Sequence, residues 1–272
     1  TDICAGRFGL LRDKVVKTLQ NICPVKHSFE RLRAEEKDGV TVMVKEAVPL
    51  GEVDLKKRIV DGLPSEIGYK GEQGITFDDV KSGKAETDDF ISQLTDSDLE
   101  ALSRGLGYMR APIGTAGNAG AYGGIIPTLT DKGVPAIITA DGPAGIRIAK
   151  YTSLLPCGTA LASTWDVELV ETLYQLVGEE MSYYEVDILL GAGMNIHRNP
   201  LCGRNFEYFS EDPLLSGKMA AAFVNGVQSS GKGACPKHFA CNNQEFNRNY
   251  NDSRISERAL REIYLKGFEI CV

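Results

Sequence analysis

Short apolar runs alternate with longer amphipathic segments through the second half of this chain. The runs Ala136 to Ala140 and Val186 to Leu190 have the length and the residue types of buried strands. One helix is predicted from about Asp166. Another begins with Asp212 as its cap and Pro213 in its first turn, where the missing N–H has no consequence. Repeated strand-then-helix units predict parallel strand pairing with right-handed crossovers.

The predicted helices also show which of their faces is buried. The first carries an apolar face formed by Val167, Val170, Tyr174, Val177, Met181 and Tyr184. A further helix begins near Ser256, and its apolar residues are Leu260, Ile263, Tyr264 and Phe268. Both a doubly wound sheet and a (β/α)8 barrel satisfy this alternation of strands and helices.

The first 85 residues are charged and mixed in character. A strand is predicted at Thr41 to Val44, and an amphipathic helix around Lys14 to Ile22. Candidate chemistry is not visible in this region. We therefore predict an upstream α+β region over residues 1–85, followed by the main domain over residues 86–272.

Local signals predict the segment that joins the two regions. Two short helices follow Thr87, and Thr95 with Asp98 three residues later resembles a capping box. Gly105 stands just past the end of the second helix. The glycine-rich segment from Gly114 to Gly124 lacks the GK[ST] ending of a phosphate loop and is predicted to be a flexible loop.

Composition narrows the classes of function. With 272 residues, of which 43% are hydrophobic, the chain can bury a substantial core. A net charge of -7 without a long Lys/Arg run argues against a nucleic-acid partner. No HExxH motif or His/Cys cluster indicates a metal site, and no cofactor is predicted.

The number and spacing of the cysteines, and the length of the apolar runs, indicate the cellular compartment. Seven scattered cysteines fit neither a disulfide framework nor a CxxC site, so reduced thiols are expected. The first residues, TDICAGRFGLLRDK, lack the apolar stretch of a signal peptide, and no later run approaches about 18 apolar residues. We expect a cytoplasmic protein without a membrane partner.

Polar residues at the ends of the apolar runs are the candidates for chemistry. Asp141 directly follows a buried strand, where its carboxylate can accept hydrogen bonds from two sugar hydroxyls. The alternative is that Asp-Gly-Pro is only a turn. Arg204 carries a guanidinium fork suited to a hydroxyl or a carboxylate, and its alternative role is an ion pair with Glu207 or Glu211.

Lys237 and His238 are adjacent, so on a regular strand they would point to opposite faces. They can reach one pocket only at a strand end or kink, which Pro236 just before them favours. The alternative is an ordinary surface pair. Tyr208 and Phe209 are predicted to pack in the interior, and His197 is interpreted as structural.

Three motifs together resemble glycoside hydrolase family 3, the β-glucosidase family. They are DGPAGIR at 141–147, NPLCGRNFEYFSEDP at 199–213 and KHFACNNQEF at 237–246. They occur in the family's order, which is far more specific than any one of them, and the resemblance is dense from about Gly105 onward. It implies a (β/α)8 TIM-type barrel, incomplete in this chain because fewer residues follow Gly105 than the roughly 250 that a barrel takes.

The resemblance also implies a reaction and a binding site. The reaction would be hydrolysis of terminal non-reducing β-D-glucosyl residues of β-glucosides or oligosaccharides by a retaining mechanism. Asp141 matches the aspartate that holds the non-reducing sugar, and Arg147 matches an arginine near the same subsite. Arg204, Lys237 and His238 match further residues of the sugar pocket. Asn242, Asn243 and Glu245 are expected to support the pocket through hydrogen bonds.

The catalytic carboxylates of such an enzyme are not identifiable here. The family nucleophile belongs to an S/T-D-W motif, and the only tryptophan, Trp165, stands in STWD. A second polypeptide or a missing C-terminal segment would have to complete the barrel. The alternatives are a non-catalytic carbohydrate-binding or interaction fragment, a β-xylosidase, or an unrelated aldolase-type barrel with Lys237 as Schiff-base amine.

Overall fold

The structure is a computed structural model, and it describes residues 27–48, 50–52, 54–107, 109 and 112–272. Contacts within the chain divide it into two units, Thr1–Glu66 and Ile67–Val272. The helix predicted around Lys14 to Ile22 lies outside the described residues. The boundary predicted at residue 85 stays a prediction.

The first unit contains a hairpin of β1 (Glu30–Lys37) and β2 (Val40–Ala47), which pair antiparallel. Its turn is Asp38-Gly39, and both residues have a positive φ, 50° and 76°, as a two-residue hairpin turn requires. The strand predicted at Thr41 to Val44 is confirmed as part of β2. A short helix follows, α2 (Leu55–Asp61), capped by Asp54.

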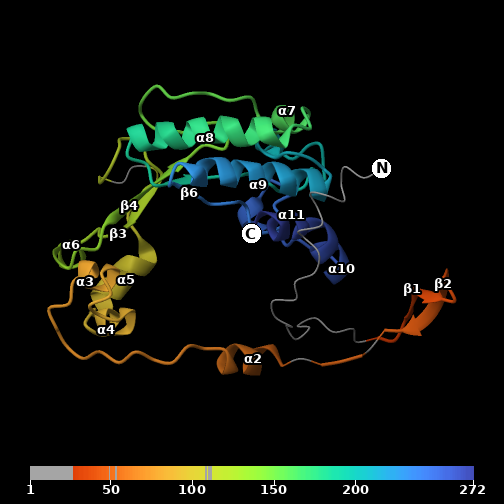
Figure 1. The fold of residues 1–272 in the computed structure, drawn as a ribbon, viewed down its shortest axis with the longest axis horizontal. Helices are drawn as coiled ribbons and strands as arrows, with labels where there is room; N and C mark the ends of the chain where they lie inside the picture. Colours follow the sequence, from red (N-terminus) through yellow and green to blue (C-terminus); the bar gives the residue numbers. More distant parts are fainter. Residues whose placement is uncertain (1–26, 49, 53, 108, 110–111) are drawn as a thin grey trace. The chain divides into compact units, whose positions relative to one another are not determined.

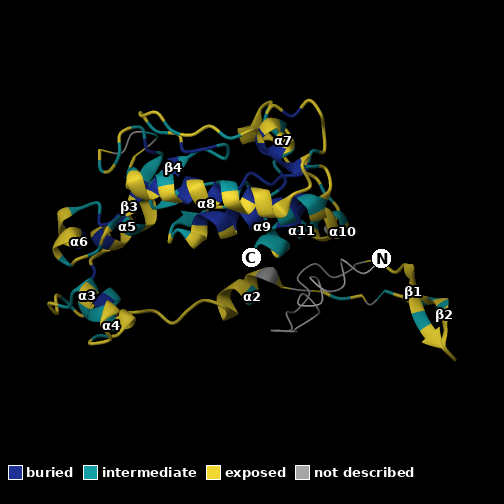
Figure 2. Ribbon diagram, turned by 45° about the horizontal axis from the view of Figure 1, so that its top comes forward, coloured by how far each residue is buried: buried dark blue, intermediate teal, exposed yellow. Residues whose placement is uncertain are grey.

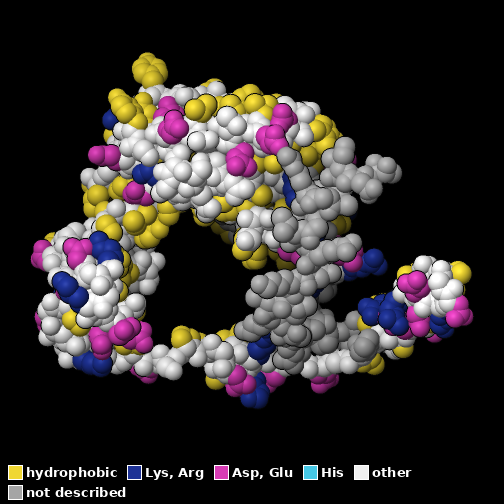
Figure 3. Space-filling model, in the orientation of Figure 1, with side chains coloured by type: hydrophobic (Ala, Val, Ile, Leu, Met, Phe, Trp, Pro, Cys, Tyr) yellow, Lys and Arg dark blue, Asp and Glu magenta, His cyan; other side chains and the backbone are white. Residues whose placement is uncertain are grey.

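The second unit begins with three short helices, α3 (Phe77–Lys81), α4 (Thr87–Ser92) and α5 (Asp96–Arg104). The predicted capping box of Thr95 and Asp98 is confirmed, as is Gly105 at the helix end with a φ of 68°. Acidic and basic side chains are interspersed over these helices and form ion pairs such as Arg104 with Glu100 (Figure 3). This mixture is typical of a solvated helix surface.

A four-stranded mixed sheet lies at the centre of the second unit. Its strands, in spatial order, are β3 (Gly120–Gly123), β4 (Ala136–Asp141), β5 (Ile188–Leu190) and β6 (Gly233–Ala234). The predicted parallel pairing is confirmed for β4 with β5 and for β5 with β6. β3, for which no strand was predicted, pairs antiparallel with β4.

β3 corrects the last part of the loop predicted from Gly114 to Gly124, while residues 114–119 are turns and irregular backbone as predicted. Glycines do not favour strands, so propensity did not reveal it. They are needed here because the backbones approach closely: a Cβ on Gly123 would lie 2.4 Å from the Pro135 oxygen, and one on Gly124 would lie 1.9 Å from the Val134 oxygen. Backbone pairing with β4 fixes this segment.

Helices cover the sheet and bury most of the core (Figure 1). The remaining helices are α6 (Pro127–Asp131), α7 (Gly158–Ala162), α8 (Val167–Tyr183), α9 (Pro213–Ser229), α10 (Glu257–Ala259) and α11 (Lys266–Cys271). α8 and α9 lie side by side, with the rings of Tyr174 and Phe223 3.9 Å apart. Buried residues recur every three or four positions along α8, with exposed residues between them, as expected of a half-buried helix (Figure 2).

The predicted caps and faces are largely confirmed. Asp166 accepts from the Leu169 N–H at 2.9 Å, and Asp212 accepts from the Leu215 N–H at 2.6 Å. The buried residues of α8 include Val170, Tyr174, Val177 and Met181 from the predicted face, but Val167 is exposed. Ile263 is exposed too, because a π-helical turn between α10 and α11, Leu260–Tyr264, shifts the register of the apolar face.

These elements confirm an α/β fold. The described residues form an open sheet with β3 and β6 at its edges, so the complete barrel stays a prediction. Among the described residues, no helix has the length and apolar character needed to cross a membrane. The cysteines within the described ranges, Cys157, Cys202, Cys235, Cys241 and Cys271, are free.

Candidate functional site

The candidate site lies where β4, β5 and β6 end. Asp141 is the last residue of β4, and Lys237 follows β6 and pairs with Gly193, which follows β5. The carboxyl ends of parallel strands meet at one edge of a sheet, where α/β proteins bind ligands. The Lys237 ammonium group therefore donates a hydrogen bond to Asp141 Oδ1 at 2.7 Å, although the two are far apart in sequence.

Asp141 also starts a tight loop that returns to the site. Its backbone pairs with that of Arg147, and the Arg147 guanidinium lies 3.6 Å from Asp141 Oδ2. Gly142 has a φ of 131°, and a Cβ there would lie 1.7 Å from the Gly145 oxygen. Asp141 is thus a turn residue that also lies beside two cations, and its contact with sugar hydroxyls stays a prediction.

The charge of Asp141 is maintained by these cations. Partial burial raises the pKa of its carboxyl, but the hydrogen bond and charge of Lys237, a backbone N–H and the charge of Arg147 lower the pKa more, and the net shift is below the ordinary value. The carboxylate is therefore ionised at neutral pH. It can accept further hydrogen bonds on its free lone pairs.

Arg204 forms an ion pair with Glu207, which confirms one of its two predicted roles. Glu207 belongs to a short 3₁₀ turn, Asn205–Glu207, and is only 5% exposed. Its second oxygen lies 3.9 Å from the Lys237 ammonium group. Burial lowers the pKa of Arg204, but the hydrogen bond and charge of Glu207 outweigh this and raise it. Sequence reasoning treated Glu207 only as an ion-pair partner and missed its contact with Lys237.

His238 is held by its backbone and by its ring. Asn195 accepts from the His238 N–H at 2.7 Å and donates to the His238 carbonyl oxygen at 2.9 Å. Ring atom Nδ1 lies 3.0 Å from the Tyr208 hydroxyl oxygen. Burial and the charges of Arg204 and Lys237 lower the pKa of His238 to about 4, so the ring is neutral at pH 7.

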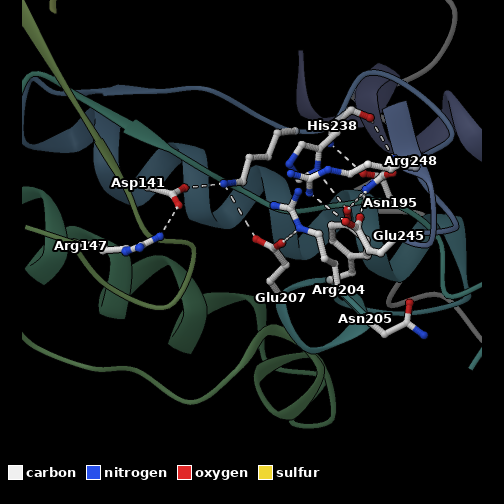
Figure 4. A network of polar contacts seen from close by, with 12 residues as sticks. Asp141, Arg147, Asn195, Arg204, Asn205, Glu207, His238, Glu245 and Arg248 are labelled. Carbon is white, nitrogen blue, oxygen red and sulfur yellow. Dashed lines mark hydrogen bonds and ion pairs between the residues drawn. The ribbon is translucent and has the colours of Figure 1, made fainter. Parts of the chain in front are cut away.

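A row of polar side chains begins at the Tyr208 hydroxyl and ends at Glu245 and Arg248, which are labelled in Figure 4. Asn242 donates to the Tyr208 hydroxyl oxygen at 2.9 Å and to Glu245 at 2.8 Å. Arg248 donates to the other oxygen of Glu245 at 2.8 Å. Asn242 and Glu245 were expected to support the pocket, whereas Arg248 and the polar role of Tyr208 were missed.

Two further predicted residues lie apart from this row. The Asn243 side-chain oxygen is buried and accepts no hydrogen bond from the described residues. His197 contacts the backbone oxygen of Asn205 at 2.9 Å, which fits the structural role assigned to it.

Several of these polar groups line two cavities that share Arg204 and Arg248, and Lys237 lines neither of them. One, of about 720 Å³, is lined by Asp141, Arg147, Arg204, Glu207 and Arg248 together with apolar residues. The other, of about 450 Å³, is lined by His238 and Asn242 and again by Arg204 and Arg248. Such convergent donors beside an ionised acceptor suit a ligand rich in hydroxyl groups. Among the described residues, no cluster of His, Cys, Asp or Glu could hold a metal ion.

The chain is similar to known proteins over most of its length. The family model for the glycosyl hydrolase family 3 N terminal domain matches residues 126–272. A β-glucosidase of Ruminococcus albus is 47% identical over 267 residues, which are 97% of this chain and 28% of that protein. β-Glucosidase A of Butyrivibrio fibrisolvens is 48% identical, over 72% of this chain and 23% of that protein.

The solved structures that resemble this chain include β-glucosidases as well. A β-glucosidase from Paenibacillus barengoltzii superposes with a TM-score of 0.79 at 48% identity, over 94% of this chain and 28% of that one. β-Glucosidase 3B from Thermotoga neapolitana in complex with glucose gives 0.62 at 51% identity, over 67% of this chain and 27% of that one. The chain thus spans about a quarter of the length of these relatives, from 23% to 28%.

Proposed function

Because this chain belongs to glycosyl hydrolase family 3, we propose that it forms the sugar-binding part of an enzyme that hydrolyses terminal β-D-glucosyl residues of β-glucosides. The observation that carries the proposal is the hydrogen bond of 2.7 Å between Lys237, which follows β6, and Asp141, which ends β4 and lines the cavity of about 720 Å³. The relatives named β-glucosidases support the choice of sugar.

In this proposal Asp141 accepts hydrogen bonds from two hydroxyls of the non-reducing glucosyl unit. Lys237 and Arg147 keep the carboxylate ionised, and such charge-assisted hydrogen bonds are stronger than neutral ones. Lys237 and His238 donate to sugar oxygens, and Arg204, which lines both cavities, is fixed by its ion pair with Glu207. The site thereby orients the anomeric carbon.

The catalytic carboxylates are proposed to come from elsewhere. A retaining glycosidase needs two carboxyl groups roughly 5 Å apart, one of them free to attack the anomeric carbon. Asp141 and Glu207 both approach Lys237, but each is already ion-paired, and Glu207 is almost completely buried. We therefore assign the nucleophile to a further segment or chain that completes a (β/α)8 barrel at the open edges of the sheet, and the acid to a separate domain.

The decisive experiment uses the full-length protein that contains this chain. We expect it to hydrolyse an aryl β-glucoside with a higher kcat/KM than the corresponding β-xyloside, and a 2-fluoroglucoside to label a residue outside residues 1–272. A label on Asp141 or Glu207 would contradict the proposed division of roles. Sugar binding without turnover would indicate a non-catalytic carbohydrate-binding protein.

A further inference from the structure

Donor and acceptor rules fix the direction of the hydrogen bonds that Glu245 and Asn242 form next to the Tyr208–His238 contact. The Glu245 carboxylate can only accept, so Arg248 and Asn242 both donate to it. The same Asn242 nitrogen donates to the Tyr208 oxygen. The Tyr208 hydroxyl keeps one proton of its own, and His238 Nδ1, 3.0 Å away, is the acceptor that the geometry offers.

We propose that Tyr208 is a positioning residue that fixes His238 in the tautomer with its proton on Nε2, with Asn242 and Glu245 holding the Tyr208 hydroxyl in place. Nδ1 is then occupied as an acceptor, and Nε2–H is the ring's donor in a residue that lines the second cavity. The benefit to glucoside binding rests on the proposed function. The tautomer itself does not.

The tautomer matters because the ring is neutral. A neutral imidazole has one donor and one acceptor nitrogen, so its tautomer decides whether it gives or takes a hydrogen bond. Burial raises the pKa of Tyr208 to about 12, so its phenol stays protonated and can donate throughout the neutral range. Tyr208 is completely buried, and the backbone of His238 is held by Asn195, so neither group can easily turn away.

A double-mutant cycle tests whether Tyr208 acts through His238. In the full-length enzyme, we expect Tyr208→Phe to lower kcat/KM for an aryl β-glucoside by about tenfold, since it removes one hydrogen bond and leaves a buried acceptor unpaired. In the His238→Gln background the same change should alter kcat/KM by less than about twofold. An equal loss in both backgrounds would show that Tyr208 serves only packing, and no loss in either would also overturn the proposal.

Tyr184→Phe is the matched control. It removes a tyrosine hydroxyl that donates to the Tyr151 carbonyl oxygen at 2.6 Å, a contact that involves none of the site residues. We expect kcat/KM to stay at the level of the unmodified enzyme. Melting temperatures of all variants separate a loss of fold from a loss of positioning.

The tautomer can be measured in the unmodified protein without any turnover. In ¹⁵N-histidine-labelled full-length protein, the signals absent from the His238→Gln variant belong to His238. We expect a pyrrole-type Nε2 and a pyridine-type Nδ1 at pH 7, and the reverse assignment would overturn the proposal. If the protein leaves β-glucosides intact but shows this tautomer, the proposed function fails while the inference about Tyr208 stands.

Discussion

At the residue scale, Asp141 meets a cation on each of its carboxylate oxygens and still borders the cavity. In the full-length enzyme, Asp141→Ala should lower kcat/KM for β-glucosides by at least about two orders of magnitude, since hydrogen bonds to charged groups are worth roughly 1.5 to 3 kcal/mol each. Steady-state kinetics measure kcat/KM, and a thermal melt establishes whether the variant is folded. A near-normal kcat/KM would mean that Asp141 is only a turn residue.

The same carboxylate should make the stability of the protein depend on pH. The pKa of Asp141 is lower in the folded protein than its ordinary value, so its stabilising contribution is complete above the unfolded pKa of about 3.9 and is lost as the pH falls through the folded pKa. We expect the difference in unfolding free energy between the protein and Asp141→Asn to be constant from pH 5 to 8 and to shrink below about pH 4. A difference that grows on acidification would contradict this sign.

Lys237 and His238 are expected to act through binding and electrostatic field. His238→Gln should lower kcat/KM and weaken inhibition by glucose-like lactams together, and Lys237→Met should do so more strongly because it removes a full charge. The acid limb of the kcat/KM profile should stay in place, since carboxyl groups elsewhere set it. A shift of that limb by about one pH unit or more would assign the substituted residue a role in proton transfer.

Sequence motifs and strand ends singled out Asp141, Arg147, Arg204 and His238, which line the two cavities, but apart from the Arg204–Glu207 ion pair they did not predict the contacts at the site. Asp141 directly follows an apolar run, and Lys237 lies shortly after another. Those positions alone predict that both residues lie at the same edge of the sheet. Tyr208 was recognised only as a buried ring. Its hydroxyl meets His238 because of the path of the chain after β6, a tertiary feature that no local pattern encodes.

At the element scale, α8 and α9 pack closely because Gly226 has no side chain. A Cβ on Gly226 would lie 2.3 Å from the Glu171 backbone oxygen and 2.8 Å from the Gln175 backbone nitrogen, both on α8. We expect Gly226→Ala to reduce the unfolding free energy by about 1 to 3 kcal/mol, the usual effect of overpacking. Chemical denaturation measures it.

Gly68→Ala is the matched control for this prediction. A Cβ on Gly68 would meet no atom within 4 Å, and its backbone does not need a positive φ. Its substitution should leave stability unchanged or raise it slightly. If both variants unfolded alike, close packing at Gly226 would not be the cause.

Elements with local signals were predicted well, and those defined by long-range pairing were not. Caps such as Asp166 and Asp212 act on N–H groups of the next turn, so the sequence window contains the whole interaction. β3 exists only through its pairing with β4, and the glycine-rich sequence conceals it. The π-helical turn Leu260–Tyr264 likewise moves Ile263 outward without a signal in the apolar spacing.

At the scale of the whole molecule, alternating strands and helices predict an α/β protein but not how its sheet closes. A doubly wound sheet and a barrel share the same local pattern and differ in which strands pair at the edges. In this chain β3 and β6 are edge strands, and β6 contains only two residues, Gly233–Ala234. Further strands from the rest of a longer protein would pair with such edges, which is why we expect the barrel to be completed from outside these residues.

The isolated 272-residue chain should therefore be unable to hydrolyse an aryl β-glucoside. It carries the proposed acceptors and donors for the sugar, but its candidate carboxylates at the cavity, Asp141 and Glu207, are held by cations and unsuited to attack. A retaining reaction without a free nucleophile stops at binding. Purified chain, shown intact by mass, is assayed alone and beside the full-length protein, with circular dichroism to establish that it is folded. Turnover by the folded chain, together with a fluoro-sugar label within residues 1–272, would show that the nucleophile lies in this chain after all.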